Sequence, residues 1–463
     1  MRFNFKLLSV LVLLAAAGVF AQSKEVDEYL QKKLTAQPLA GISVAVVQDG
    51  KAVYAKGVGM ANVENNVPAT ENTVYQLASI TKQFTATGIM ILVEEGKIGL
   101  DEPVSKYLAN LPAAWQPITI RQLLTHTSGI PNYTRFFEGI EKTKDYSHEE
   151  ILKLVAEKPM DFPAGEGWNY SNTGYFLLGM MIEKVSGKDY PAFMRERIFT
   201  PLGMNATRVN DLREVIKDRA TGYTADKGAV KHAARTSPTQ PFAAGAIIST
   251  IMDMAKWDAA LNNGKLLKQA SLKEMWTPAK LKDGKPTTYG FGWGVKTYRM
   301  LPMIAHNGGI DGFSTNIARF PDQKVTVIVL ANSDAANAEK MSEEIAAFYI
   351  PALVANAPKA IEDKDTKTTE FLRKVADAIV AGNAEADWFT PDAQKNLFPD
   401  RIKQVVGLFA GKGGISKFEL MEEGPREQNK FRAYVATVGD LKVRFNFVLA
   451  PDGKIAMVGL RPE

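Results

Sequence analysis

Cysteine is absent from this 463-residue sequence. Its absence excludes a disulfide framework, a thiolate metal site and a lipid anchor attached to cysteine. Histidine is scarce, with four residues, and no HExxH motif is present, so a zinc hydrolase has little support. A GxSxG motif is also missing, which argues against an α/β-hydrolase. We therefore expect neither a metal nor a cofactor.

The charged residues do not form the pattern of a nucleic-acid-binding surface. The formal net charge is +5, and no cluster of lysine and arginine is interleaved with aromatic residues. Nucleic acid is therefore not an expected partner.

The N-terminal segment, residues 1–21, has the three parts of a secretory signal peptide. Arg2 and Lys6 are basic, Leu7–Phe20 is apolar, and Ala21 is a small residue at which a peptidase can cut. A membrane anchor is the alternative interpretation, but the apolar run is shorter than the roughly 20 residues that a span requires. We expect cleavage after Ala21, a mature charge of +3, and export to the periplasm or the cell exterior.

The pattern of apolar residues predicts a large domain, 22–357, in which strands from both ends bracket a helical middle. After a helix at 26–34, two strands flank the turn Asp49-Gly50, and alternating strands return after Gly290. Residues 79–95 and 119–200 have mainly helical patterns. This order predicts an α/β (α+β) domain in which helices flank one antiparallel sheet and form an inserted lobe, rather than a parallel βαβ fold.

A charged and polar segment, 358–370, is typical of a linker and separates a second domain, 371–463. Helical patterns at 371–382 and 392–409 precede four strand patterns, at 415–423, 430–438, 441–449 and 454–460. We expect a small α+β domain that binds a partner or mediates dimerisation.

The motif Ser79-Ile80-Thr81-Lys82 is the only SxxK in the chain. Residues at i and i+3 of a helix share a face, so the hydroxyl of Ser79 and the amine of Lys82 would meet. Serine needs a base to become a nucleophile at neutral pH, and a desolvated lysine can be that base. The alternative is an ordinary solvated helix surface.

Tyr170-Ser171-Asn172 is the only YxN in the chain. Tyr170 could take a proton from Ser79 or give one to a leaving group, and Asn172 could accept from Lys82 and donate to a substrate carbonyl. Asn172 or Thr173 as a cap of the following helix is the alternative.

His306-Asn307-Gly308-Gly309 is the third candidate. Glycine lets a substrate lie close to the backbone, and the N–H groups of Gly309 and Ser79 could together form an oxyanion hole. The alternative is a glycine-rich hairpin turn at 308–312 with a surface imidazole.

SITK, YSN and HNGG, in this order, resemble the three active-site motifs of the serine β-lactamase and penicillin-binding-protein superfamily, and most closely its class C, D-aminopeptidase and esterase branch. The similarity covers about residues 25–350 and includes four longer segments: RQLLTHTSGIPNY (121–133), FPAGEGWNYSNTGYFLLG (162–179), AAGAIISTIMDMAKW (243–257) and HNGGIDGFST (306–315). The C-terminal domain lies outside it and resembles the NTF2-like roll only in its helix-then-strand order.

The resemblance implies a nucleophile at Ser79, a base or proton relay at Lys82 and a general acid/base at Tyr170. Asn172, His306 and Gly308 would contact substrate, and the N–H groups of Ser79 and Gly309 would bind the oxyanion.

The expected protein is an exported serine hydrolase that cleaves a β-lactam, a D-amino-acid peptide or an acyl ester through an acyl-serine intermediate. Its substrate would be a small molecule or peptide, such as one derived from the cell wall. The alternative is a binding protein that acylates slowly or never turns over.

Most β-lactamases have KTG as the third motif, and here His306 and Asn307 replace its first two residues. An unperturbed imidazole has a pKa near 6.5, so much of the cation that holds a β-lactam carboxylate would be missing at neutral pH.

Five other residues are given structural roles. His126 is expected to end a helix and order the loop after it, and Trp168 and Tyr175 to pack around the site. His148 and His232 have no companions in the sequence and are expected at the surface.

Overall fold

The computed structural model describes residues 22–398, 402, 407, 409, 411–439 and 441–462. The expected signal peptide, 1–21, and most of 399–409, the later part of the expected helical region 392–409, lie outside these residues. The chain divides into two compact units, Met1–Ala355 and Asn356–Glu463, which are described separately.

The first unit contains a seven-stranded antiparallel sheet in the order β3-β2-β1-β12-β11-β10-β9. Strand β1, from the start of the unit, pairs with β12, from its end, so both ends of the domain build one sheet as expected. The strands are β1 (Gly41–Gln48), β2 (Lys51–Asn62), β3 (Val67–Pro68), β9 (Gly294–Tyr298), β10 (Leu301–Ile310), β11 (Phe313–Phe320) and β12 (Val325–Ala331).

Both faces of this sheet are covered, and the alternation of side chains explains how. Successive residues of a strand point to opposite faces. In β12, Val327 and Val329 therefore join one core, and Ile328 and Leu330 join the other. The first core includes Val26 of the helix at 22–36 and residues of α11 (Ala338–Tyr349), while the second is shared with the helical lobe.

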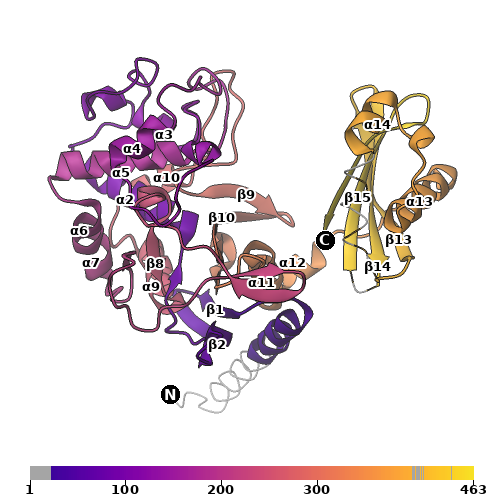
Figure 1. Cartoon of the computed structure of the whole chain (residues 1–463), viewed down its shortest axis with the longest axis horizontal. Helices are drawn as coiled ribbons and strands as arrows, with labels where there is room; N and C mark the ends of the chain where they lie inside the picture. Colours follow the sequence, from indigo (N-terminus) through magenta and orange to yellow (C-terminus); the bar gives the residue numbers. More distant parts are fainter. Residues whose placement is uncertain are drawn as a thin grey trace, which may run out of the picture. The chain divides into compact units, whose positions relative to one another are not determined.

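The helical lobe follows β2 and carries the first two motifs (Figure 1). Its helices are α2 (Thr81–Glu94), α3 (Ile120–Leu124), α4 (His148–Lys153), α5 (Asn172–Ser186), α6 (Tyr190–Met194), α7 (Thr200–Leu202), α8 (Phe242–Gly245), α9 (Ile251–Asn263) and α10 (Gln269–Met275). Helix α12 (Pro351–Ala355) ends the unit. Short strands β4 (Tyr75–Gln76), β8 (Ile247–Ser249) and β5 (Arg208–Val209) form one small sheet, and β6 (Tyr223–Asp226) pairs with β7 (Ala229–His232).

Short helical turns complete the elements. They are the 3₁₀ turns η1 (Ala78–Ile80), η2 (Val104–Lys106), η3 (Tyr133–Phe136), η5 (Pro321–Gln323) and η6 (Ala386–Trp388), and the π-helical turn η4 (Arg195–Phe199).

Local sequence sets several helix ends. Helix α3 begins with a capping box. The Thr119 side chain accepts a hydrogen bond from the Gln122 backbone N–H, and the Gln122 side chain accepts one from the Thr119 backbone N–H. Helix α5 ends at Gly187, which has the left-handed conformation that glycine adopts without a Cβ penalty.

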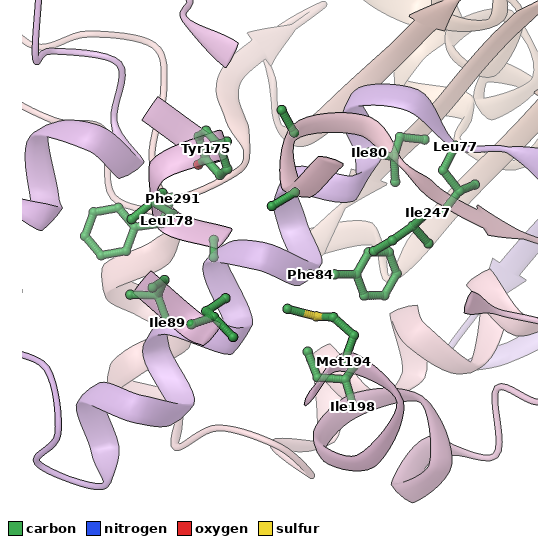
Figure 2. Close-up of a cluster of buried hydrophobic side chains, with 14 of the residues drawn as sticks. Leu77, Ile80, Phe84, Ile89, Tyr175, Leu178, Met194, Ile198, Ile247 and Phe291 are labelled. Atoms are coloured by element: carbon green, nitrogen blue, oxygen red, sulfur yellow. The ribbon is translucent and has the colours of Figure 1, made fainter. Parts of the chain in front are cut away.

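Helix α2 is buried on all sides, since each residue from Thr81 to Leu92 is shielded from solvent. A helix that is surrounded in this way lies inside the domain rather than on its surface. Figure 2 shows part of the surrounding core, in which Phe84 lies near Met194, Ile198 and Ile247. The core therefore holds the SITK segment in a fixed position.

The second unit has a four-stranded antiparallel sheet in the order β13-β14-β15-β16, with helices α13 (Thr366–Ala381) and α14 (Pro391–Leu397). Its strands are β13 (Ile415–Arg426), β14 (Asn429–Val438), β15 (Leu441–Leu449) and β16 (Ile455–Pro462). Helix α13 begins at Thr366, before the expected start at Phe371, because the Asp365 side chain caps it by accepting from the Thr368 N–H. Its buried face packs in one core with aromatic residues of the sheet.

Candidate active site

The SITK motif lies where the 3₁₀ turn η1 passes into helix α2. Ala78, just before Ser79, has φ +49°, a left-handed conformation that is uncommon for a residue other than glycine. Ser79 is half-buried, whereas Lys82 is completely buried. Lys82 Nζ lies 3.1 Å from Ser79 Oγ, so the helical spacing does bring the amine to the hydroxyl.

Among the described residues, Lys82 is surrounded by oxygen atoms but has no carboxylate partner. Nζ donates to Asn172 Oδ1 and to the Ala244 carbonyl oxygen, each at 2.8 Å. Burial lowers the pKa of Lys82 well below its ordinary value. A neutral amine has two N–H groups for these two acceptors, and its lone pair then remains for the Ser79 hydroxyl.

Tyr170 is placed beside this pair. Its ring centroid is 4.7 Å from Lys82 Nζ, and its buried hydroxyl has no hydrogen-bond partner of ordinary geometry among the described residues. Burial raises the pKa of Tyr170, and the nearby Ser79 hydroxyl offsets only part of that effect. Tyr170 is therefore protonated at rest, which makes it a proton donor rather than the first base.

The capping interpretation of Asn172 and Thr173 is wrong. Ser171 occupies the N-cap position of α5, its side chain accepts no capping hydrogen bond, and Asn172 is the first residue of the helix. The Thr173 hydroxyl instead donates to the Pro131 carbonyl oxygen at 2.7 Å. The Asn172 side chain is thus free to bind Lys82.

The HNGG motif lies inside strand β10, not in a hairpin turn as one interpretation expected. The turn comes later, at Asp311-Gly312. Gly308 is required by close packing, because a Cβ atom there would lie 2.2 Å from the Leu77 carbonyl oxygen and 2.4 Å from Thr315 Oγ1. This contact holds β10 against the residues that precede Ser79.

His306 is buried rather than exposed, which corrects the surface interpretation. The Tyr289 hydroxyl donates to Nε2 at 2.7 Å, and Nδ1–H donates to the Asn307 carbonyl oxygen at 2.6 Å. Burial, helped by the nearby Lys82, lowers the pKa of His306 to about 3. The ring is therefore neutral, with its Nδ1–H tautomer fixed by these two bonds.

A cavity of about 240 Å³ opens beside Ser79. Its wall includes Asn172 and Gly309, but neither His306 nor Gly308 is among the described residues that line it. The remaining lining residues are Ala78, Tyr133, Thr134, Phe137, Lys142, Thr236, Gln240, Pro241, Ala244, Gly245, Ile310 and Asp311. The two residues expected to supply oxyanion donors, Ser79 and Gly309, thus face one space.

Comparison with protein families agrees with this geometry. The family described as Beta-lactamase matches residues 26–350. The chain belongs to the Beta-lactamase family.

Similar proteins include the penicillin-binding protein 4* of Bacillus subtilis (strain 168), which is 29% identical over 425 residues, covering 83% of this chain and 94% of that protein. An octameric penicillin-binding protein homologue from Pyrococcus abyssi has 26% identity and a TM-score of 0.63, over 95% of this chain and 90% of that one. A D-amino acid amidase from Ochrobactrum anthropi SV3 has 28% identity and a TM-score of 0.61, over 72% and 99%. The chain has the β-lactamase-like fold.

Two residues of this Beta-lactamase family site were not assigned to it from sequence. The Nδ1 atom of His126 accepts the Ser171 N–H at 3.2 Å, and its ring lies 4.4 Å from that of Tyr170 and 4.6 Å from that of Tyr289. Burial, then Lys82 and His306, lowers the pKa of His126 well below its usual range. His126 follows α3, as expected, but it orders the distant YSN loop. Tyr289 binds His306 and carries no motif that could have identified it.

The other expected structural residues lie near their predicted places. Tyr175 is buried and donates to the Leu124 carbonyl oxygen at 2.7 Å, and the partly exposed Trp168 lies 6.2 Å from the His126 ring. His232 is exposed, as expected, and lies beside Glu64, whereas His148 is half-buried and lies 3.7 Å from Glu183.

Within the described part of the chain, no group of three or more His, Asp or Glu residues is placed to hold a metal ion. No helix there is long and apolar enough to cross a membrane.

Proposed function

We propose that this protein is a serine hydrolase that cleaves an amide, peptide or ester bond through an acyl intermediate on Ser79. The observation that carries the proposal is the environment of Lys82, which is completely buried, has no carboxylate partner in the described part of the chain and lies 3.1 Å from the Ser79 hydroxyl. A buried amine whose pKa is depressed is the base that a serine nucleophile needs.

The proposed reaction begins when Lys82 Nζ takes the hydroxyl proton and Ser79 Oγ bonds to the substrate carbonyl carbon. The N–H groups of Ser79 and Gly309 stabilise the resulting oxyanion. The bond to the leaving group breaks as Tyr170 gives that group a proton, and Tyr170 regains a proton from the Lys82 ammonium. Water then attacks the acyl carbonyl carbon, and Tyr170 takes a proton from the water as it passes its own to Lys82. The ester bond to Ser79 Oγ breaks as the Lys82 ammonium returns a proton to that oxygen.

The neutral state of His306 favours amide or ester substrates over β-lactams. A cation at the third motif would hold a β-lactam carboxylate, but the pKa of His306 is about 3 and the ring bonds to Tyr289. Two similar structures are named for amide hydrolysis with D stereochemistry: the amidase from Ochrobactrum anthropi, and a D-stereospecific amidohydrolase from Streptomyces with 29% identity and a TM-score of 0.59. These names support D-amino-acid amides as the first substrates to test.

We also propose that the protein is exported, on the basis of the signal-peptide pattern at residues 1–21. N-terminal sequencing of the secreted or periplasmic form should begin at Gln22.

Replacement of Ser79 by alanine tests the proposed function. The wild type should react with a fluorophosphonate probe at Ser79 and hydrolyse members of a panel of D-amino-acid amides, D-Ala-D-Ala peptides, acyl esters and β-lactams. Ser79→Ala should lose labelling and at least about a thousandfold in turnover, because the nucleophile is gone. Ser105→Ala, at an exposed serine, is the matched control. Labelling of Ser79→Ala at the wild-type rate would show that another residue is the nucleophile.

A further inference from the structure

Asp311 lies on the wall of the cavity beside Ser79. Lys142 Nζ and Thr236 Oγ1 both donate to Oδ2, each at 2.8 Å. Among the described residues, Oδ1 has no hydrogen-bond partner. A carboxylate that is fixed through one oxygen in this way presents the other to the cavity as an acceptor.

The backbone of the β10–β11 turn fixes the position of Asp311. The Gly312 N–H donates to Asp334 Oδ2 at 3.1 Å, and Gly312 has φ +79°. A Cβ atom at Gly312 would lie 2.6 Å from the Gly222 Cα, so the turn is also held against a second segment. Asp311 comes two residues after Gly309, which links it rigidly to the expected oxyanion donor.

Gln240 also lines this cavity and carries an acceptor that is unpaired among the described residues. Its Nε2 donates to the carbonyl oxygens of Glu141, Lys142 and Lys144, which fixes the orientation of the side-chain amide. Its Oε1 is buried and has no partner among the described residues. A buried acceptor without a donor is unfavourable, and a ligand N–H group would satisfy it.

The charges around the cavity select between ligands. Burial lowers the pKa of Lys82 and of His306, which disfavours a cation at either position to hold a substrate carboxylate. Lys142 is about half exposed and already pairs with Asp311. The unpaired polar atoms described on the cavity wall, Asp311 Oδ1 and Gln240 Oε1, are thus hydrogen-bond acceptors. They match the three N–H groups of an ammonium ion.

We propose that Asp311 binds the free α-ammonium group of the substrate and so selects amino-acid amides or peptides with an unblocked N-terminus. Gln240 Oε1 is the second acceptor for substrate N–H groups, and Tyr133, Phe137 and Ile310 form the apolar wall against the substrate side chain. A cavity of about 240 Å³ suits a substrate of amino-acid size. This inference rests on the proposed function and names its substrate class.

The test uses three matched compounds: phenylalaninamide in the enantiomer that the wild type hydrolyses, its N-acetyl derivative, and 3-phenylpropanamide, which lacks the amine. The wild type should prefer the free amine. Asp311→Asn should lower kcat/KM for the free amine about 10- to 100-fold, mainly through KM, and change the other two less than about twofold, since only the amine loses a charged partner. Equal effects of Asp311→Asn on all three compounds would overturn the proposal.

Lys142→Met tests the alternative that Lys142, rather than Asp311, binds the substrate, through a substrate carboxylate. Removing Lys142 frees Asp311, so KM for the amine should stay the same or fall. If Lys142 instead binds a substrate carboxylate, Lys142→Met will impair D-Ala-D-Ala peptides while Asp311→Asn spares the free amine, and the proposal is wrong.

A measurement on the wild type alone keeps the test decisive if Asp311→Asn does not fold. The ratio of kcat/KM for the amine to that for 3-phenylpropanamide should fall above about pH 8, as the α-amine loses its proton. A constant ratio would overturn the proposal. Fluorophosphonate labelling of Ser79 separates the two failures: labelling without amine preference refutes only the role of Asp311, and no labelling refutes the proposed function as well.

Discussion

The regions around Lys82 and Arg319 bury a basic side chain in opposite ways. Within the residues that the structure describes, Lys82 has no carboxylate partner and donates to neutral oxygens of Asn172 and Ala244 besides its contact with Ser79. Arg319 is 3% exposed, and its Nε donates to Asp258 Oδ1 at 2.7 Å. Asp258 also accepts from the Thr326 hydroxyl at 2.8 Å.

The difference separates a chemical role from a structural one. A buried cation with an ionised partner stays charged, and each ion compensates the other. A buried amine without such a partner releases its proton instead and becomes a base. The two regions therefore predict different responses to the loss of the basic side chain.

Lys82→Met should have the largest effect, and the effect should be on rate. We expect kcat to fall about 10²–10⁴-fold because the base for Ser79 is lost. Two effects on stability oppose each other: the variant no longer pays the desolvation cost of a buried amine, but the two acceptors of Lys82 lose their donor. The free energy of unfolding should therefore stay within about 1 kcal/mol of the wild type. Steady-state kinetics and urea denaturation measure both, with the exposed Lys184→Met as control. A stable variant with wild-type kcat would contradict the role of Lys82.

Arg319→Met should show the reverse behaviour. Asp258 would be left as a buried, uncompensated charge, and we expect about 3–5 kcal/mol loss in the free energy of unfolding. Below the melting transition, Ser79 should still react with a fluorophosphonate at close to the wild-type rate. The double variant Asp258→Leu, Arg319→Met should recover part of the lost stability. If Arg319→Met slows labelling of the folded protein as much as Lys82→Met does, the two regions are not distinct.

Sequence predicted those parts of the site that depend on local spacing. SITK brings Ser79 and Lys82 together because one helical turn is a local property, and the alternating strands correctly predicted a sheet built from both ends of the domain. The strand position of His306 was missed because glycines are typical of turns, whereas Gly308 is needed for close approach to the Leu77 backbone.

The remaining errors come from contacts between distant segments. Asn172 has the composition of a cap, but Lys82, ninety residues earlier, determines its partner. Tyr289 and Asp311 belong to no motif, and only the fold brings them to His306 and to the cavity. No spacing rule in the sequence identifies single residues of this kind.

His306 is a third buried basic side chain, and the effect predicted for it is the smallest. Its pKa is about 3 in the folded protein and near 6.5 in the unfolded chain. Between pH 3 and pH 6.5, the unfolded chain therefore binds a proton at His306 that the folded protein does not bind. The stability that the neutral ring contributes is complete above pH 6.5 and is lost as the pH falls toward 3.

Between pH 7 and pH 5 the wild type should therefore lose about 2 kcal/mol through His306. Denaturant unfolding of the wild type and of His306→Gln across this range measures it, and the comparison removes most of the contribution of His126, whose pKa is lowered mainly by burial. The His306→Gln curve should be flatter by that amount. Parallel curves would mean that His306 binds a proton in the folded state, and a cation would then be present at the third motif, as in a site that holds a substrate carboxylate.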